Sequence, residues 1–187
     1  MIDRTAIINK TAKVHSSVKI GPYTIIGPNV EIGENTEIQS HVSIIGNTKI
    51  GKGNKIYPFV SINDPQDLKY NGEETSLVIG DNNKIREYVT INPGTIGGGG
   101  KTIIGNNCLL MISSHIAHDC KVGNNVVIAN NVNLGGHVTL EESVVMIPSS
   151  PSILMFCITT LPNPCGEICI SALELAVEIK LSLSVIP

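Results

Sequence analysis

The sequence has few of the large aromatic side chains that usually fill a protein core. Its 187 residues include no Trp, four Tyr and two Phe, so that aromatic residues make up only 3% of the chain. A chain of this length is long enough to form one domain or one short solenoid with a buried interior. Because rings are scarce, aliphatic side chains must fill that interior, and stacked aliphatic ladders would do so.

Positive charge and long apolar runs are also scarce. The net charge of −3 excludes nucleic-acid binders that depend on a basic surface. The longest uncharged apolar stretch lies near residues 153–161, far short of the ~20 residues that a spanning helix needs. The polar start of the chain has no apolar segment behind it, so no secretory signal is expected. Together these absences predict a cytoplasmic protein without a membrane span.

The five cysteines are an odd number and show no metal-type pairing. They stand at Cys108, Cys120, Cys157, Cys165 and Cys169. In a cytoplasmic protein a disulfide framework is not expected. The 18 glycines and the frequent Asn instead indicate many turns.

The dominant feature is an aliphatic residue at every sixth position. The first run of this column is Ile8, Val14, Ile20, Ile26, Ile32, Ile38, Ile44, Ile50, Ile56 and Ile62. The column returns as Ile79, Ile85 and Ile91, and then as Ile104, Leu110, Ile116, Val122, Ile128, Leu134 and Leu140. A second column, two residues earlier, is mostly small or β-branched. The phase breaks at residues 63–78 and again at residues 92–103.

A period of six fits neither a helix, which repeats at about 3.6 residues, nor an alternating strand, which repeats at 2. It suits a short strand followed by a tight turn, with three such sides closing one coil of eighteen residues. Successive coils would stack at the parallel-strand spacing of ~4.8 Å, with each inward residue on the one eighteen positions earlier. We therefore predict an all-β fold, a parallel β-helix of hexapeptide repeats over residues 1–146. A β-sandwich of short strands has no reason to keep strict six-residue phase.

The first break is a polar segment that runs from Asp64 to Glu73. Insertions in a solenoid become loops on one face, and such loops often bind ligands. Its Gln66, Asp67 and Lys69 lie close together and are candidates for binding. An ordinary solvated surface loop is the alternative.

The second break, residues 94–102, is rich in glycine and resembles a phosphate-binding P-loop. The P-loop spacing would require glycine at the position of Thr95, and a helix would have to follow Lys101. Here a repeat strand is expected instead. We interpret the segment as a flexible Gly-rich loop.

Three histidines fall in the third run, where coil arithmetic applies. Eighteen residues after His118 comes Gly136, and eighteen after Asp119 comes His137. The pattern predicts two imidazoles, one carboxylate and a bare glycine backbone in one patch. A His beside an Asp can act as a general base, and a glycine N–H can donate to an oxyanion. Three alternatives stay open: a zinc site that includes His115, as in β-helical carbonic anhydrases, ordinary polar surface residues, or residues stacked between coils for structure alone.

Several segments in this order resemble a known family. The segment Leu109–Cys120 is similar to the signature of the UDP-N-acetylglucosamine O-acyltransferases, which start lipid A synthesis. Their Q-D-L-K-Y insertion matches Gln66–Tyr70, and their next coil matches Asn130–Val138. The stretch from Ile85 to Thr95 also matches. The resemblance covers about residues 1–145 and implies a left-handed β-helix.

The resemblance also implies a reaction. A 3-hydroxyacyl group would pass from acyl carrier protein to the 3-hydroxyl of UDP-N-acetylglucosamine. His118 would be the general base, Asp119 would orient it, and the Gly136 N–H would stabilise the oxyanion.

The remaining implied roles concern binding and assembly. Gln66, Asp67, Lys69, His115 and His137 would bind substrate. The family needs no metal or other cofactor, and its members are homotrimers with the site between neighbouring subunits.

The pattern fails after about residue 146, where repeat phase and composition change together. We expect residues 147–187 to form an irregular tail in place of further coils, as in a truncated or frameshifted product. An unpaired last coil would be an exposed parallel edge unless the tail covers it. The chain could then be a catalytically inactive remnant.

Overall fold

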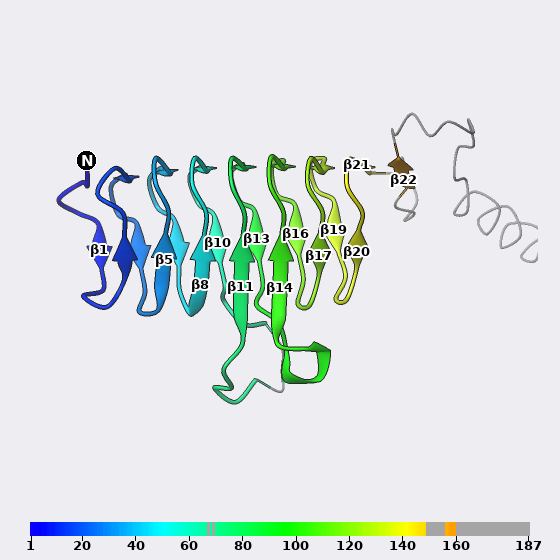
Figure 1. Cartoon of the computed structure of the whole chain (residues 1–187), viewed down its shortest axis with the longest axis horizontal. Coiled ribbons are helices and arrows are strands. Elements are labelled where there is room, and N and C mark those ends of the chain that lie inside the picture. The colour runs from blue at the N-terminus through cyan, green and yellow to red at the C-terminus, as the bar shows by residue number, and fades with distance from the viewer. Residues whose placement is uncertain (67, 69, 149–155, 160–187) are drawn as a thin grey trace, which may run out of the picture.

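The computed structural model describes residues 1–66, 68, 70–148 and 156–159. In this part of the chain, three sheets of short strands wind into a column of stacked coils (Figure 1). Every strand pair is parallel and joins successive coils, except the antiparallel pair of β21 and β22. The predicted hexapeptide β-helix is thereby confirmed, and its left-handed sense is that of the family whose members it resembles.

Each face of the column is one sheet. Sheet 1 contains β1 (Ile7–Ile8), β4 (Ile25–Ile26), β7 (Ser43–Ile44), β10 (Ser61–Ile62), β13 (Thr90–Ile91), β16 (His115–Ile116) and β19 (Asn133–Leu134). Sheet 2 contains β2 (Lys13–Val14), β5 (Val30–Ile32), β8 (Asn47–Ile50), β11 (Ser76–Ile79), β14 (Lys101–Ile104), β17 (Lys121–Val122) and β20 (Thr139–Leu140). Sheet 3 contains β3 (Lys19–Ile20), β6 (Glu37–Ile38), β9 (Lys55–Ile56), β12 (Lys84–Ile85), β15 (Leu109–Leu110), β18 (Val127–Ile128), β21 (Val144–Ile147) and β22 (Phe156–Thr159).

The six-residue column forms the core. On sheet 3, Ile38 pairs with Ile20 and Ile56, and the ladder continues through Ile85 and Leu110. All of these side chains are buried. A fully buried aliphatic side chain contributes roughly 1.5–3 kcal/mol, so the ladder is the main source of stability. Among the described residues the core contains no aromatic side chain, as the composition predicted.

Asparagine and glycine serve the corners for different reasons. Asn29 and Asn35 adopt positive φ of 59° and 56°, as the turn prediction requires. The glycines that follow the inward Ile do not need positive φ. A Cβ at Gly21 would lie 2.8 Å from the backbone of Gln39 in the next coil. At these positions glycine is required by close approach between coils and not by a positive φ.

Four ring side chains form an exposed ladder outside the core. Tyr23, His41, Phe59 and Tyr88 stack along the corner between sheets 3 and 1, with ring centroids 5.1 Å apart at each step. All four have positive φ, which is rare for bulky residues. Stacking between rings in successive coils offsets part of this strain.

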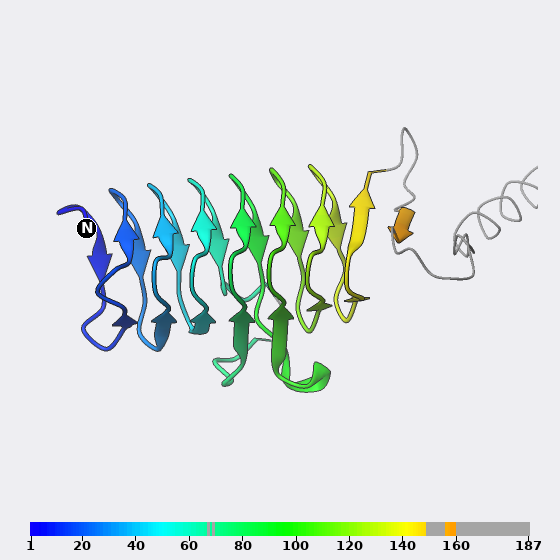
Figure 2. The same ribbon diagram turned by 45° about the horizontal axis from the view of Figure 1, so that its top comes forward.

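Both breaks in the repeat are loops that leave the same corner, between sheet 1 and sheet 2. The first loop joins β10 to β11, and the second joins β13 to β14 and contains the short 3-10 helix η1 (Ile96–Gly98). Figures 1 and 2 show them projecting side by side from one edge of the column. They lie together because they leave successive coils of the column.

The regular coils end with β21, whose last inward residue is Met146. On sheet 3, β22 pairs antiparallel with β21, so one of the three faces at this end is covered. The division at residue 146 stays a prediction, since residues 149–155 and 160–187 lie outside the described residues. Within the described part of the chain, no helix has the length and apolar character needed to cross a bilayer.

Candidate functional site

Four of the predicted site residues lie at the corner from which both loops leave. His118 and Asp119 lie between β16 and β17, and Gly136 and His137 lie between β19 and β20 in the next coil. In each case the chain turns from sheet 1 to sheet 2. The eighteen-residue arithmetic therefore placed these four residues correctly.

His118 and Asp119 form a hydrogen-bonded pair. The distance from His118 Nδ1 to Asp119 Oδ2 is 2.8 Å, and the Asp119 side chain is only 1% exposed. Burial alone raises the pKa of the Asp119 carboxyl. Hydrogen bonds from the Thr95 hydroxyl, the Thr95 N–H and His118 outweigh burial and hold that pKa below its ordinary value. An ionised Asp119 accepts only, so Nδ1 of His118 carries the proton and Nε2 is left as the basic nitrogen.

Gly136 provides the flat surface against which the His118 ring lies. A Cβ at Gly136 would lie 2.5 Å from Cε1 and 2.6 Å from Nε2 of that ring, so only glycine fits. The next residue, His137, donates its N–H to the His118 carbonyl at 3.0 Å. Its ring meets the His118 ring edge-on, with centroids 5.0 Å apart. The basic Nε2 is therefore next to the Gly136 backbone.

His115 lies on β16, three residues before His118 in the same coil, and its outward side chain is half-buried. Its Nδ1 lies 2.7 Å from the hydroxyl of Thr90 on β13. Burial lowers the pKa of His115, which favours the neutral ring. A neutral imidazole held in this way can accept or donate one hydrogen bond to a ligand.

A pocket of about 430 Å³ lies between the first loop and the wall that carries His115 and His118. Gln66 lines it from the loop, and Thr95 from the second loop. His137 is not among the lining residues, although it contacts His118. The predicted binding residues Asp67 and Lys69 lie outside the described residues.

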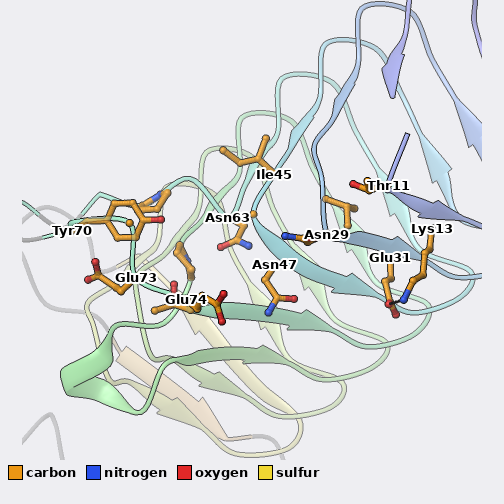
Figure 3. Close-up of a pocket in the computed structure, with 16 residues that line it drawn as sticks. Thr11, Lys13, Asn29, Glu31, Ile45, Asn47, Asn63, Tyr70, Glu73 and Glu74 are labelled. Atoms are coloured by element: carbon orange, nitrogen blue, oxygen red, sulfur yellow. Dashed lines mark hydrogen bonds and ion pairs between the residues drawn. The ribbon is translucent and has the colours of Figure 1, made fainter. Parts of the chain in front are cut away.

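A larger pocket of about 710 Å³ adjoins the first one on the N-terminal side of the first loop. Figure 3 shows Tyr70, Glu73 and Glu74 on the loop side, facing Asn47 and Glu31 on the sheet. The His118–Asp119 pair does not line it. Because His118 lines the smaller pocket and not the larger one, we assign the candidate site to the smaller pocket.

Sequence reasoning missed the role of Thr95. Its N–H and hydroxyl both reach the Asp119 carboxylate, at distances between 2.6 and 3.1 Å. The coil arithmetic could not find this contact, because Thr95 lies in a loop that breaks the phase.

The cluster of His118, Asp119 and His137 has the residue types of a metal site, with ligand atoms within 4.8 Å of one another. Asp119 already accepts hydrogen bonds on both oxygens, and Nδ1 of His118 points at it. Without breaking these bonds, only the two imidazole side chains of this cluster remain as ligands. Catalytic zinc sites use three protein ligands, so the geometry favours proton transfer over the zinc alternative.

The family model described as bacterial transferase hexapeptide (six repeats) matches residues 11–46, 29–64 and 101–136. The structure of LpxA from Acinetobacter baumannii is 50% identical over 77% of this chain, with a TM-score of 0.76. The UDP-N-acetylglucosamine O-acyltransferase LpxA of Moraxella catarrhalis is 51% identical over 77% of this chain, with a TM-score of 0.75. The chain belongs to the UDP-N-acetylglucosamine acyltransferase family.

More distant members of this family also match. The LpxA of Bacteroides fragilis, a UDP-N-acetylglucosamine acyltransferase, is 44% identical over 78% of this chain, with a TM-score of 0.75. The chain spans 56–57% of the length of these three acyltransferases. The family resemblance in the sequence is confirmed over the β-helix that carries the site.

Proposed function

We propose that this chain carries the catalytic β-helix of a UDP-N-acetylglucosamine O-acyltransferase. The reaction would transfer a 3-hydroxyacyl group from acyl carrier protein to the sugar 3-hydroxyl, the first step of lipid A synthesis. The observation that carries the proposal is His118, which lines a pocket, is hydrogen-bonded to Asp119 and lies against a bare glycine backbone, in a chain of this family.

In the proposed mechanism, Nε2 of His118 removes the proton from the 3-hydroxyl as its oxygen attacks the thioester carbonyl. Asp119 stabilises the imidazolium that forms, as the carboxylate does in a Ser-His-Asp triad. The Gly136 N–H donates to the oxyanion of the tetrahedral intermediate. Collapse of this intermediate breaks the carbon–sulfur bond, and His118 returns its proton to the departing thiolate.

Substrate binding is assigned to the residues around this pair. Gln66 and His115 line the pocket, and His137 contacts the base, which supports their role. Asp67 and Lys69 belong to the same loop and are proposed on the family resemblance. The resemblance also leads us to propose a homotrimer that works in the cytoplasm, with acyl carrier protein as its partner.

The direct test is to incubate the purified chain with UDP-N-acetylglucosamine and 3-hydroxyacyl-acyl carrier protein and to detect the 3-O-acyl product by mass spectrometry. We expect product with the wild-type chain and with His15→Ala, an exposed histidine far from the site. We expect none above background with His118→Ala. If the folded wild-type chain forms no product, the inactive-remnant alternative holds instead.

A further inference from the structure

The Gly-rich loop between β13 and β14 is anchored to the candidate site. Thr95 donates its hydroxyl to Asp119 Oδ2 at 2.6 Å. Its N–H donates to both carboxylate oxygens, at 2.9 and 3.1 Å. The backbone N–H of Asp119 also donates to the hydroxyl of Thr102 on β14, at 2.8 Å. The carboxylate that orients His118 is therefore held mainly by the loop.

Only one glycine of the loop tip packs against this carboxylate. A Cβ at Gly98 would overlap both carboxylate oxygens of Asp119. A Cβ at Gly97 would meet nothing within 4 Å, and the same holds for Gly99, which instead has a φ of 102°. The glycine run therefore combines one position of close approach with open positions next to it.

Asp119 stands at a corner of the coil, where its φ of 59° lies in the left-handed region. A carboxylate that is 1% exposed needs donors on both oxygens to stay ionised. Within the described residues, the loop supplies every donor to this carboxylate except His118.

We propose that Thr95 is a positioning residue: together with the space left by Gly98, it clamps the Asp119 carboxylate so that His118 keeps its proton on Nδ1 and presents a basic Nε2 to the substrate. This proposal rests on the proposed function only for its effect on turnover. The tautomer of His118 is a property of the free protein. The clamp can therefore be tested even if the chain forms no product.

The first test compares Thr95→Val with Thr95→Ser. Valine replaces the hydroxyl with a methyl at a distance too short for a carbon–oxygen contact, so the carboxylate must move away. Long-range ¹H–¹⁵N NMR of the imidazoles should show His118 mainly protonated on Nδ1 in the wild type and in Thr95→Ser. Thr95→Val should shift the population toward the Nε2–H form. Where the wild type turns over, kcat of Thr95→Val should fall about 10–100-fold with KM changed less than about twofold.

The second test uses the glycine pair as matched variants. Gly98→Ala should disturb the His118 tautomer and kcat as Thr95→Val does, whereas Gly97→Ala should match the wild type in both. Thermal unfolding of all four variants shows whether each is folded at the assay temperature. A wild-type His118 tautomer in both Thr95→Val and Gly98→Ala would overturn the clamp, even if the acyltransferase assay succeeds. An absence of product in the wild type, with the tautomer shifts as expected, would overturn the proposed function and leave the clamp standing.

Discussion

Replacing Gly136 with alanine tests the geometry of the site most directly. The new methyl would lie 2.5 Å from Cε1 and 2.6 Å from Nε2 of the His118 ring. Carbon atoms in contact are normally about 3.5–4.0 Å apart. The two groups must therefore separate by about 1 Å. The coil backbone cannot open easily, because the next N–H, that of His137, is bonded to the His118 carbonyl.

The ring of His118 has to absorb this displacement. Rotating it away from Gly136 lengthens the 2.8 Å contact between Nδ1 and Asp119 Oδ2, and in the proposed mechanism it moves Nε2 away from the substrate hydroxyl. A misplacement of about 1 Å can reduce a rate by about 100-fold. We expect kcat of Gly136→Ala to fall by about that factor, with a smaller change in KM.

Gly135→Ala is the matched control, because a Cβ at Gly135 meets nothing within 4 Å. Initial rates of product formation should show Gly135→Ala within about twofold of the wild type. NMR of the imidazoles should report a shifted His118 only in Gly136→Ala. If Gly136→Ala kept a wild-type rate and wild-type His118 signals, the placement of the ring against this backbone would be refuted.

Three further predictions concern stability and titration. Ile85→Ala, in a central coil, should lower the free energy of unfolding by about 2–5 kcal/mol. Ile8→Ala should lower it by clearly less, because Ile8 is only partly buried in the first coil. Denaturant unfolding measures both losses, and equal losses would contradict the aliphatic ladder as the source of stability. Because folding lowers the pKa of Asp119, the stability it contributes is complete above its unfolded pKa of about 4 and is lost as the pH falls through the lower folded value. The difference in free energy of unfolding between wild type and Asp119→Asn should therefore shrink in acid, whereas a constant difference would argue against an ionised, bonded carboxylate. Because burial lowers the pKa of His115, its NMR titration midpoint should fall below about 6.5, and a midpoint at or above that value would mean that the ring is more exposed than described.

Much of the fold could be predicted from periodicity alone. One aliphatic residue in six excludes helix and ordinary strand, and a coil of eighteen residues then sets which residues are neighbours. This is why Gly136 could be placed beside His118 from the sequence alone. In the structure the ring of His118 packs against the Gly136 backbone. The reason is physical: a parallel β-helix is nearly one-dimensional, so sequence separation becomes distance along one axis.

The arithmetic fails where the phase breaks. The loop residue Gln66 could be connected with the site only through family resemblance, and Thr95 was not connected with it at all. A loop outside the repeat is not tied to the axis, and its path depends on packing against the wall. The tertiary structure decided that the Gly-rich loop folds back onto Asp119, because hydrogen bonds to a buried carboxylate stabilise that path.

The sequence by itself determined the coil, its core and the pairing of residues eighteen apart. The corner glycines show where local rules stop: Gly21 looks like a residue chosen for positive φ, yet it is required by the backbone of the next coil. Only the stacked structure decided which glycines are needed for close approach, and which side chains hold the carboxylate behind His118. The first depends on how closely the backbones of stacked coils approach one another. The second depends on the path of a loop that breaks the period.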